Sequence, residues 1–464
     1  MKNRLLPFGY IALFGARFVY ATTAAACNTL QSALPGRVFF PGSEEYVKGA
    51  GHTGNVGFSS TTGVQISMSR FNDIEYDESQ STVKIGAGLT WDKVYAALEP
   101  HGVKVVGGRV PGVGVGGLLL GGGYSYFTDQ YGLAIDTVVS YDLVLPNGTF
   151  VQVAGQNNPD LFFALKGGFN NFGIVTSFNL RTFPQTNVWV SNIMYPLNAT
   201  SAFNRAIQNF SFSNRDLKAA ALTGYGAASF NEIFATAGLF YDAPMPPRGV
   251  FDEFFNIPGA IVTVTGTMSL SEALQSLNGA LGSLDPPRYG SIYCIPSPVL
   301  SPNTKTDRTV RHTIPVSRYT VGILDEIRAQ VERIVSKAAA GNHTFITLGI
   351  GPEPFVQPNA HSTDSAYPHP RGRFVCPTVM EAHYPNVADD GFFNNAVRKA
   401  QQAIQLRAIK EGQSFPDDIL YNNYAPPDTP LKLIYGSNLA RLRDIKKRVD
   451  PSNVMGLAGG FKIQ

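Results

Sequence analysis

The segment Gly107–Gly123 reads GGRVPGVGVGGLLLGGG and contains nine glycines in seventeen positions, with Arg109 as its only charged residue. Glycine inside a helix or a strand costs about 0.5–1 kcal/mol relative to alanine. This density therefore predicts backbone that takes positive φ or that touches another group closely, rather than a regular helix or strand. A bulky ligand lying against main-chain N–H groups is the partner that such a segment favours.

The composition indicates a globular chain that does not bind nucleic acid. A length of 464 residues suits roughly two to four domains with sizeable cores. The net charge is +3 and no dense run of Lys and Arg occurs, so we expect no nucleic-acid partner. The 31 Phe and 20 Tyr suit a large flat ligand, although a large aromatic core explains them equally simply.

The N-terminus predicts export. A basic start leads into an apolar run over 5–20 and then into small residues up to Ala26, which is the outline of a signal peptide spanning 1–26. Pro7 and Arg17 interrupt the run, and it is too short for a good transmembrane helix. We therefore expect a soluble, secreted protein with no membrane partner.

Glycosylation sequons agree with export. They begin at Asn147, Asn198, Asn209 and Asn342, and each is a weak signal alone. The three cysteines, Cys27, Cys294 and Cys376, are an odd number for an oxidising compartment, so at least one stays unpaired or bonds elsewhere. No CxxC pair or Cys/His cluster indicates a metal site.

Periodicity and turn residues predict an α+β chain. Helices are expected at 27–34, 90–100 with Thr90 as N-cap, 160–165, 321–339 and 392–410; strands or β-rich runs at 63–68, 82–88, 133–139, 141–145, 150–153, 172–180 and 188–194. Residues 146–149, Pro-Asn-Gly-Thr, are a hairpin signal. Glycine density falls after Pro184, which indicates a domain boundary there.

A nicotinamide-type Rossmann domain is one reading of the glycine segment. Residues 112–117 satisfy GxGxxG, and Asp136 follows at about the distance expected for an acidic residue that binds ribose. A Rossmann glycine turn opens a helix, however, whereas here Leu118–Leu120 run into Gly121–Gly123, which break helices. We therefore reject this reading.

Motifs along the chain resemble the berberine bridge enzyme-like FAD-linked oxidases, whose flavin domain is of the PCMH or vanillyl-alcohol-oxidase type. The similar segments, in order, are KGAGHT (48–53), TVKIGAGLTWDKVYAAL (82–98), GVGVGGLLLGGG (112–123), YGLAIDTVVSYDLVLPNG (131–148), LFFALKGGFNNFGIVTSF (161–178), NNYAPP (422–427) and YGSNLARLRDIKKRVDPSNVMGLAGGFK (435–462). The resemblance implies an α+β fold with a flavin domain over 27–184, a substrate domain over 185–419 and a returning segment over 420–464.

The resemblance also implies site residues. His52 matches the histidine that bonds covalently to the flavin 8α-methyl group. Main-chain contacts to the flavin would come from Gly49, Gly51, Thr53, Gly112, Gly114, Gly116 and Gly117, and its ring or adenine side would be lined by Ala134, Asp136, Gly173 and Val175. Tyr421, Asn423 and Tyr424 match the Y-x-N-Y element, whose tyrosine lies over the flavin and can take a substrate proton. A phenol with a pKa near 10 would need that pKa lowered by neighbours to act in this way.

Two departures from the family pattern bear on flavin binding. Many members attach flavin a second time through a cysteine, and the matching position here is Val110, so attachment through His52 alone is expected. Members also place a βαβ-sized stretch between the PGSxxY turn and the glycine-histidine turn, whereas here Tyr46 is followed directly by Val47 and Lys48. A skipped coding segment and a degenerate protein both explain this junction, and we favour the first.

The expected function is therefore that of an FAD-dependent oxidase. It would remove hydride from an alcohol, a sugar or a secondary metabolite, pass the electrons to O₂, and act as a monomer on a small-molecule substrate. The alternative is a secreted, non-catalytic member that binds flavin poorly and acts as a ligand-binding protein. Yellow colour after purification favours the enzyme, and colourless protein favours the alternative.

Overall fold

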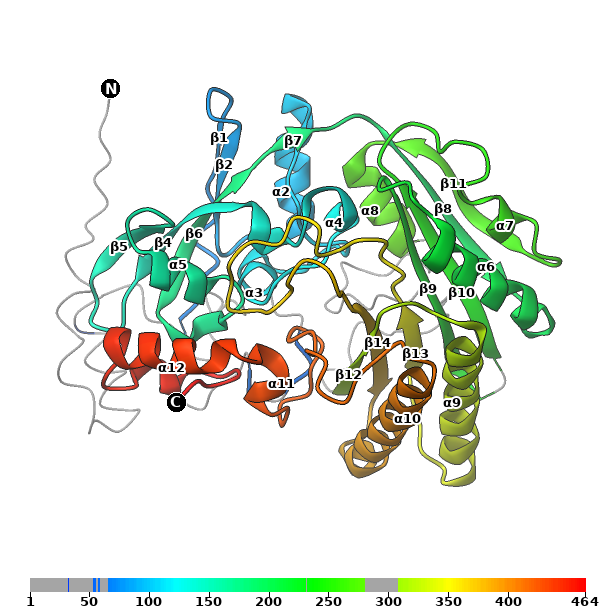
Figure 1. Cartoon of the computed structure of the whole chain (residues 1–464). Helices are drawn as coiled ribbons and strands as arrows, with labels where there is room; N and C mark the ends of the chain where they lie inside the picture. Colours follow the sequence, from blue (N-terminus) through cyan, green and yellow to red (C-terminus); the bar gives the residue numbers. More distant parts are fainter. Residues whose placement is uncertain (1–31, 33–52, 56, 59–65, 231, 280–307) are drawn as a thin grey trace.

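The computed structural model describes Ser32 and residues 53–55, 57–58, 66–230, 232–279 and 308–464 (Figure 1). The predicted signal peptide, the flavin-contacting residues Gly49, Gly51 and His52, and the junction after Tyr46 lie outside the described residues. The predicted helix at 27–34 does as well, apart from Ser32. Within the described part of the chain, no helix is both long and apolar enough to span a membrane.

An antiparallel five-stranded sheet forms the first part of the described chain. Its order is β1 (Ile74–Asp77), β2 (Thr82–Gly86), β6 (Ile174–Arg181), β4 (Val138–Val144) and β5 (Phe150–Ala154). Every pairing in it is antiparallel, which is a second reason to reject a parallel Rossmann sheet. The predicted turn at 146–149 joins β4 to β5 as a hairpin. Helices α2 (Trp91–Leu98), α3 (Val115–Leu120), α4 (Thr128–Tyr131) and α5 (Pro159–Leu165) belong to this part.

A seven-stranded antiparallel sheet forms the second part. Its order is β11 (Ile261–Met268), β8 (Val188–Tyr195), β10 (Glu232–Tyr241), β9 (Ala219–Ser229), β13 (Thr347–Pro352), β14 (Cys376–Tyr384) and β12 (Arg308–Val316). The accompanying helices are α6 (Thr200–Ser213), α7 (Asp252–Phe255), α8 (Leu270–Gly279), α9 (Val321–Ala340) and α10 (Asp390–Lys410). The short strands β3 (Val103–Lys104) and β7 (Phe183–Pro184) pair with each other; β3 follows α2 within the first part of the chain, and β7 lies between β6 and β8.

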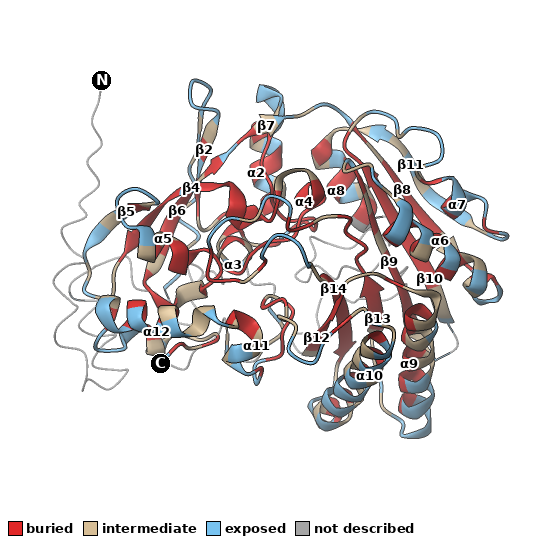
Figure 2. Ribbon diagram, in the orientation of Figure 1, coloured by how far each residue is buried: buried red, intermediate tan, exposed pale blue. Residues whose placement is uncertain are grey.

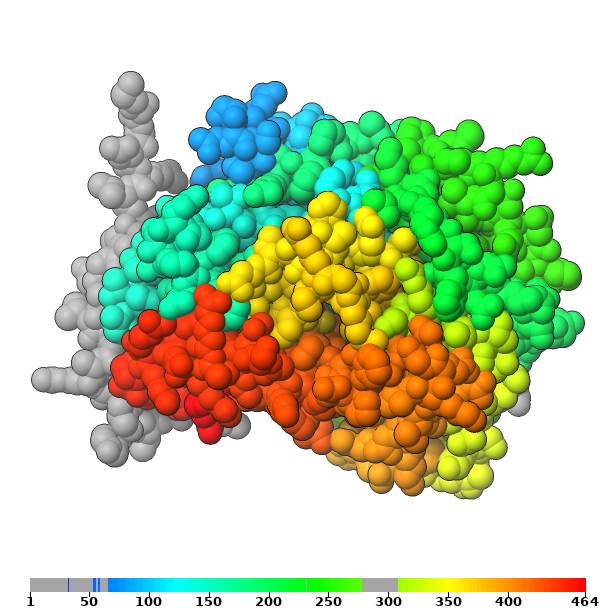
Figure 3. Space-filling model, in the orientation of Figure 1, coloured from blue at the N-terminus to red at the C-terminus, as the bar shows by residue number. Residues whose placement is uncertain are grey.

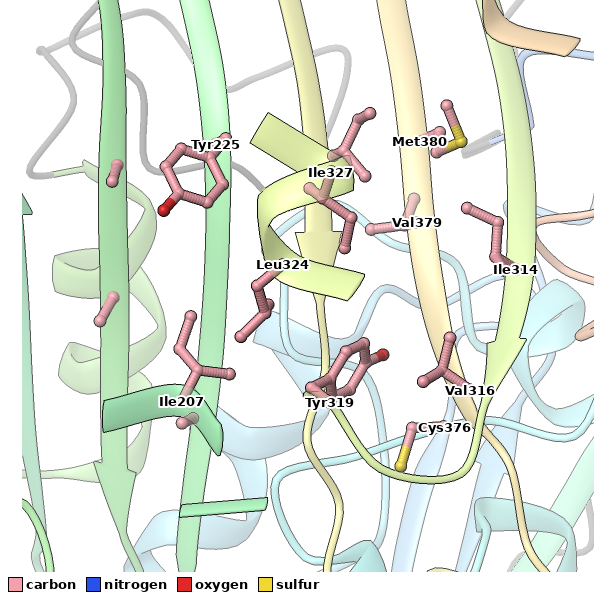
Figure 4. Packing of buried hydrophobic residues seen from close by; sticks show 14 of the residues in the cluster. Ile207, Tyr225, Ile314, Val316, Tyr319, Leu324, Ile327, Cys376, Val379 and Met380 are labelled. Atoms are coloured by element: carbon pink, nitrogen blue, oxygen red, sulfur yellow. The ribbon is translucent and has the colours of Figure 1, made fainter. Parts of the chain in front are cut away.

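Helix α9 illustrates how N-terminal capping and the spacing of apolar residues produce the helices of the second part. Thr320 caps its N-terminus by accepting a hydrogen bond from Ile323 N at 3.2 Å, and the helix ends at Gly341. Apolar residues at three- and four-residue spacing, including Leu324 and Ile327, are fully buried against the sheet (Figure 4). Each such side chain contributes about 1.5–3 kcal/mol through burial. The outer faces of α9 and α10 are exposed (Figure 2).

Three local predictions need correction. The glycine segment does contain a helix: α3 begins after Gly114, ends before Gly121 and includes Gly116 and Gly117. Residues 66–68 of the strand predicted at 63–68 are irregular, and 63–65 are outside the described residues. The apolar run at 133–139 is mostly a 3-10 turn, Ala134–Thr137, because the Asp136 carboxylate bonds back to Leu133 N at 3.0 Å.

Two later segments return to the first part of the chain. Residues 353–375, called the strap here, cross the face of the molecule between the two sheets (Figures 1 and 3). Backbone N–H groups of Val356 and Gln357 donate to the Asp129 carboxylate at 2.9 and 2.8 Å, which anchors the strap. The C-terminal helices α11 (Leu431–Tyr435) and α12 (Asn438–Val449) follow, and α12 packs against α5.

Candidate active site

A cavity of about 340 Å³ lies where the glycine segment, β12 and the C-terminal segment meet. Its described lining is Thr53, Asn55, Phe58, Arg109, Val110, Val113, Gly114, Gly117, Leu118, Leu120, Tyr124, Phe169, Asn170, Arg311, Tyr421, Asn422, Asn423, Tyr424, Gly459, Gly460 and Phe461. Most of this lining is apolar or aromatic, and its charged groups are two arginines. The returning C-terminal segment thus shares one cavity with the glycine segment.

Two residues of the triple glycine, Gly121 and Gly122, make room for the tyrosine element. A Cβ on Gly121 would lie 2.4 Å from Asn423 Oδ1, and one on Gly122 would lie 3.4 Å from the ring of Tyr421. Gly122 and Gly123 also take positive φ, +114° and +88°, which L side chains rarely adopt. Gly121 and Gly122 therefore serve close packing against residues 421–423, about 300 positions later in the sequence, whereas Gly123 packs against Leu118 and Ala134.

Tyr421 lies in a cluster of buried aromatic rings. Its ring centroid is 4.8 Å from those of Tyr124 and Tyr424 and 5.9 Å from that of Tyr367 in the strap. Asn423 Nδ2 donates to the Tyr421 hydroxyl at 3.0 Å, and Tyr124 N donates to it at 3.4 Å. Burial raises the pKa of Tyr421, and the hydrogen bond from Asn423 offsets only part of that rise.

Tyr424 belongs to a buried cluster with Arg109 and Glu353. Its hydroxyl donates to Glu353 Oε1 at 3.1 Å, while Arg109 Nη2 donates to Glu353 Oε2 at 2.8 Å and to the Tyr424 oxygen at 3.1 Å. All three side chains are at least 95 % buried, since their exposed fractions are 5 %, 5 % and 1 % for Tyr424, Arg109 and Glu353. One carboxylate, one phenol and one guanidinium therefore share a dry site at the cavity wall.

Burial dominates the electrostatics of this cluster. Burial and then the Glu353 carboxylate raise the pKa of Tyr424 well above its usual value, and Arg109 opposes the rise. Burial also raises the pKa of Glu353, with the Arg109 guanidinium pulling it back. Burial therefore outweighs the neighbours that lower the pKa of these two phenols, which are Asn423 for Tyr421 and Arg109 for Tyr424. The Tyr424 hydroxyl already has an acceptor for its own proton, which is Glu353 Oε1.

A second ion pair adjoins the cavity. Arg311 on β12 pairs with Glu381 on β14, whose side chain is fully buried. His383 Nε2 lies 3.3 Å from Glu381 Oε2, and the Arg311 guanidinium lies 5.7 Å from the centre of the Tyr424 ring. The two arginines of the cavity wall thus come from the glycine segment and from β12, and each is matched by a buried carboxylate.

Several residues expected at the flavin lie away from the described cavity lining. Gly112 has φ +78° and donates its N–H to Asp92 Oδ1 at 2.8 Å, and a Cβ on Gly116 would approach Ala87 O to 3.3 Å. Gly173 has φ +147°, and a Cβ there would lie 2.5 Å from Val144 O. Ala134 and Val175 are buried in the core of the first part. Each of these residues has contacts within the protein, and their flavin contacts stay predictions.

Asp136 also has a packing role. Its carboxylate accepts from Thr363 N at 2.9 Å and lies 2.9 Å from His369 Nε2, so it holds the strap. Burial alone would raise the pKa of Asp136, but hydrogen bonds from His369 and Thr363 hold it below its usual value. Because His369 Nδ1 faces the Tyr367 carbonyl at 2.8 Å, both ring nitrogens face acceptors.

Comparison with known proteins assigns the chain to a family. The FAD binding domain family matches residues 44–154, and the berberine and berberine like family matches residues 420–458. The FAD-dependent monooxygenase drtC of Aspergillus calidoustus is 30% identical over 426 residues, which cover 90% of this chain and 77% of that protein. The chain belongs to the berberine bridge enzyme-like FAD-linked oxidoreductases.

Solved structures agree on the fold of this family member. The carbohydrate oxidase from Microdochium nivale superposes with a TM-score of 0.72 at 18% identity, covering 95% of this chain and 99% of that one. The 6-hydroxy-D-nicotine oxidase from Arthrobacter nicotinovorans gives a TM-score of 0.70 at 19% identity, with coverage of 90% and 85%. The PCMH-type flavin fold with a second α+β domain, expected from the sequence, is thereby confirmed.

The residues present fit FAD. A Cβ on Gly117 would meet nothing within 4 Å, so the helix backbone borders open space in the cavity. Gly459 and Gly460 line the cavity from the C-terminal segment, and a Cβ on Gly460 would meet only Asn170 Oδ1, at 3.3 Å. Phe169 and Phe461, with ring centroids 6.0 Å apart, supply apolar surface for a flat ring. The cavity is therefore shaped for a group that touches backbone on two sides.

Three cavity-wall or adjoining residues were not assigned from sequence. Arg109 stood out as the only charge in the glycine segment, but its role depends on Glu353, 244 positions away. Glu353 follows the apolar strand β13 between two prolines, Pro352 and Pro354, and a carboxylate at a strand end was a usable signal. Asn422 sits inside the Y-x-N-Y element at the position that the motif leaves open.

Proposed function

We propose that this FAD-linked oxidoreductase removes hydride from a C–H bond of an alcohol, sugar or secondary metabolite and passes the electrons to O₂. The observation that carries the proposal is the hydrogen-bonded set Arg109–Glu353–Tyr424 at the wall of the FAD-shaped cavity. Bound FAD would supply two-electron acceptance and reoxidation by O₂. The protein supplies orientation, a dry site and a path for the proton.

The proton path follows from the hydrogen bonds. When a substrate C–OH loses hydride from carbon, its hydroxyl proton must leave, and Tyr424, which lines the cavity, would receive it. Tyr424 hands its own proton to Glu353 Oε1, so no free phenolate with a raised pKa has to form. Arg109 contacts both oxygens and stabilises negative charge on either one. Asn423 orients Tyr421 beside this path.

Anaerobic flavin reduction in a stopped-flow instrument tests this path. Tyr424→Phe is expected to slow flavin reduction by about 10²–10⁴-fold, with a much smaller change in substrate affinity. Tyr195→Phe is the matched control, because Tyr195 is equally buried and loses a hydrogen bond to Phe254 O, at 3.1 Å, away from the cavity. Equal rates of flavin reduction in the two variants would show that Tyr424 takes no part in the reaction. The same comparison with Tyr421→Phe tests whether Tyr421 takes part.

We further propose that His52 alone holds FAD covalently. Two contacts of the neighbouring residues support this: Thr53 lines the cavity, and Asn55 Nδ2 donates to Ala425 O at 2.9 Å, next to Tyr424. Val110 lines the cavity where other members carry a second attachment cysteine. Acid-precipitated protein should keep its flavin fluorescence, and His52→Ala should release the colour into the supernatant. Fluorescence in the pellet of that variant would assign the bond to another residue.

The substrate class and the compartment are also proposals. Screening sugars and aromatic alcohols for peroxide release separates sugar oxidation from oxidation of an aromatic metabolite. Export with N-glycosylation is supported by the exposure of all four sequon asparagines, Asn147, Asn198, Asn209 and Asn342. Secretion by a fungal host, a glycosidase-sensitive mass and cleavage after Ala26 are the expected results, and size-exclusion chromatography tests the proposed monomer.

A further inference from the structure

Arg311 is the one residue between 185 and 419 that lines the cavity, among the residues that the structure describes. It lies on β12, and 6 % of it is exposed. This span holds the whole seven-stranded sheet, so the sheet contributes an arginine and no other described residue to the cavity wall. Arg311 Cζ lies 5.7 Å from the centre of the Tyr424 ring. The arginine therefore stands beside the phenol that we propose receives the substrate proton.

The cavity wall presents cations, while the carboxylates that balance them stand behind it. Arg109 and Arg311 belong to the lining, whereas their partners Glu353 and Glu381 do not. The Glu381 side chain is fully buried. No Asp or Glu occurs in the described lining of the cavity. A group bound there meets a guanidinium before it meets a carboxylate, and this order favours an anionic group over a cationic one.

The phenols near Arg311 have hydrogen-bond partners within the protein. The Tyr421 hydroxyl accepts from Asn423, and the Tyr124 hydroxyl donates to Val375 O at 3.3 Å. A sugar carries a hydroxyl on most of its carbons, and each hydroxyl that is buried on binding needs a polar partner. The described wall at this end offers mainly aromatic rings and a guanidinium instead. It suits a flat aromatic ring with an acidic group better than it suits a sugar.

We propose that Arg311 selects an aromatic substrate that carries an acidic group, either a carboxylate or an ionised phenol. A guanidinium has five N–H donors in a planar fork, which is more than the Glu381 carboxylate alone engages. Its geometry matches a second carboxylate through charge-assisted hydrogen bonds. The inference rests on the proposed oxidase and narrows its substrate class. Arg311 acts on substrate binding, whereas the proton path runs through Tyr424 and Glu353.

Equilibrium binding tests this selection without turnover. The FAD-loaded protein is titrated at pH 7 with benzoate and, separately, with benzamide, which has nearly the same shape and no charge. Binding is followed by the change in flavin absorbance. Benzoate is expected to bind about 10- to 100-fold more tightly than benzamide, as charge-assisted hydrogen bonds imply. In Arg311→Met the preference should disappear through weaker binding of benzoate, with the affinity for benzamide unchanged.

Two variants that break the same ion pair separate selection from packing. Arg311→Met removes the cation, so the preference for benzoate should be lost; Glu381→Gln keeps the cation, so the preference should be kept or increased. Arg311→Met/Glu381→Met strands no charge and should repeat the first result if Arg311→Met does not fold. Arg308→Met is the control on the same strand, because Arg308 pairs with Asp390 outside the cavity lining, and it should keep the preference.

Three results would overturn the inference. The first is a parent protein that binds benzoate and benzamide equally. The second is the same change of preference in Arg311→Met and Glu381→Gln, which would assign the pair to packing. The third is an Arg311→Met variant that loses flavin but keeps the preference, which would assign Arg311 to the cofactor. Failure of the proposed oxidase is read separately, as a protein that prefers benzoate through Arg311 but releases no peroxide with any alcohol or sugar.

Discussion

Replacing Glu353 by Gln removes the only negative charge of the Arg109–Glu353–Tyr424 cluster while keeping its shape. Arg109 cannot lose its proton, so the substitution leaves a guanidinium that is 5 % exposed without the carboxylate 2.8 Å away. Removing one partner of a buried pair costs about 3–5 kcal/mol. At about 2–4 °C for each kcal/mol in a domain of about 150–250 residues, the melting temperature of the domain that holds Glu353 should fall by roughly 6–20 °C.

The partner substitution should behave differently with pH. Arg109→Met leaves a buried carboxyl that can become neutral by taking up a proton, and without Arg109 its already raised pKa rises further. The folded state then binds more protons than the unfolded state, so the variant should lose stability as pH rises from 5 to 8. Glu353→Gln should show no such added slope, because its stranded charge is on Arg109.

Urea unfolding followed by fluorescence at pH 5 and pH 8 checks both statements. The double variant Arg109→Met/Glu353→Met should be more stable than Glu353→Gln, because it strands no charge. Two results would refute the mutual dependence of Arg109 and Glu353. One is a Glu353→Gln variant whose free energy of unfolding lies within 1 kcal/mol of that of the parent protein. The other is a double variant whose loss of stability equals the sum of the two single losses.

Three further changes have defined expected results. Gly121→Ala places a Cβ 2.4 Å from Asn423 Oδ1, so it should cost about 1–3 kcal/mol and slow flavin reduction, whereas Gly391→Ala, with open space around its Cβ, should do neither. Burial lowers the pKa of His312 to about 4, so between about pH 6.5 and 4 the unfolded state binds a proton that the folded state does not. The free energy of unfolding should therefore fall as the pH drops through that window. His312→Gln should remove this part of the acid sensitivity in urea titrations. Burial lowers the pKa of Lys462 to about 8, which means that its charge is disfavoured in the folded state at pH 7. After allowance for solvent screening, Lys462→Met should raise the free energy of unfolding by about 1 kcal/mol at pH 7. A gain in stability that persists above pH 10.5 would contradict this cause.

Local sequence was sufficient for many of the elements. The hairpin at 146–149, the helix from Val321 to Ala340 and the helix from Asp390 to Lys410 follow from turn residues and from a 3.6-residue apolar period, and both helices were expected within two residues of their observed ends. The run at 133–139 was predicted as a strand and mostly forms a 3-10 turn, because the Asp136 carboxylate accepts a hydrogen bond from Leu133 N.

The sequence by itself determined the family, the fold class and the meeting of a glycine segment with a tyrosine element, since these rest on ordered motifs that need no coordinates. Only the tertiary structure decided that Gly121 makes room for Asn423, that Asp136 holds the strap and that Glu353 receives the hydrogen bond of Tyr424. The reason is physical: a turn or a helix depends on residues a few positions apart, whereas a buried carboxylate acquires its role from groups that the fold brings to it. Arg109 and Glu353 are 244 positions apart, and nothing local to either one specifies the other.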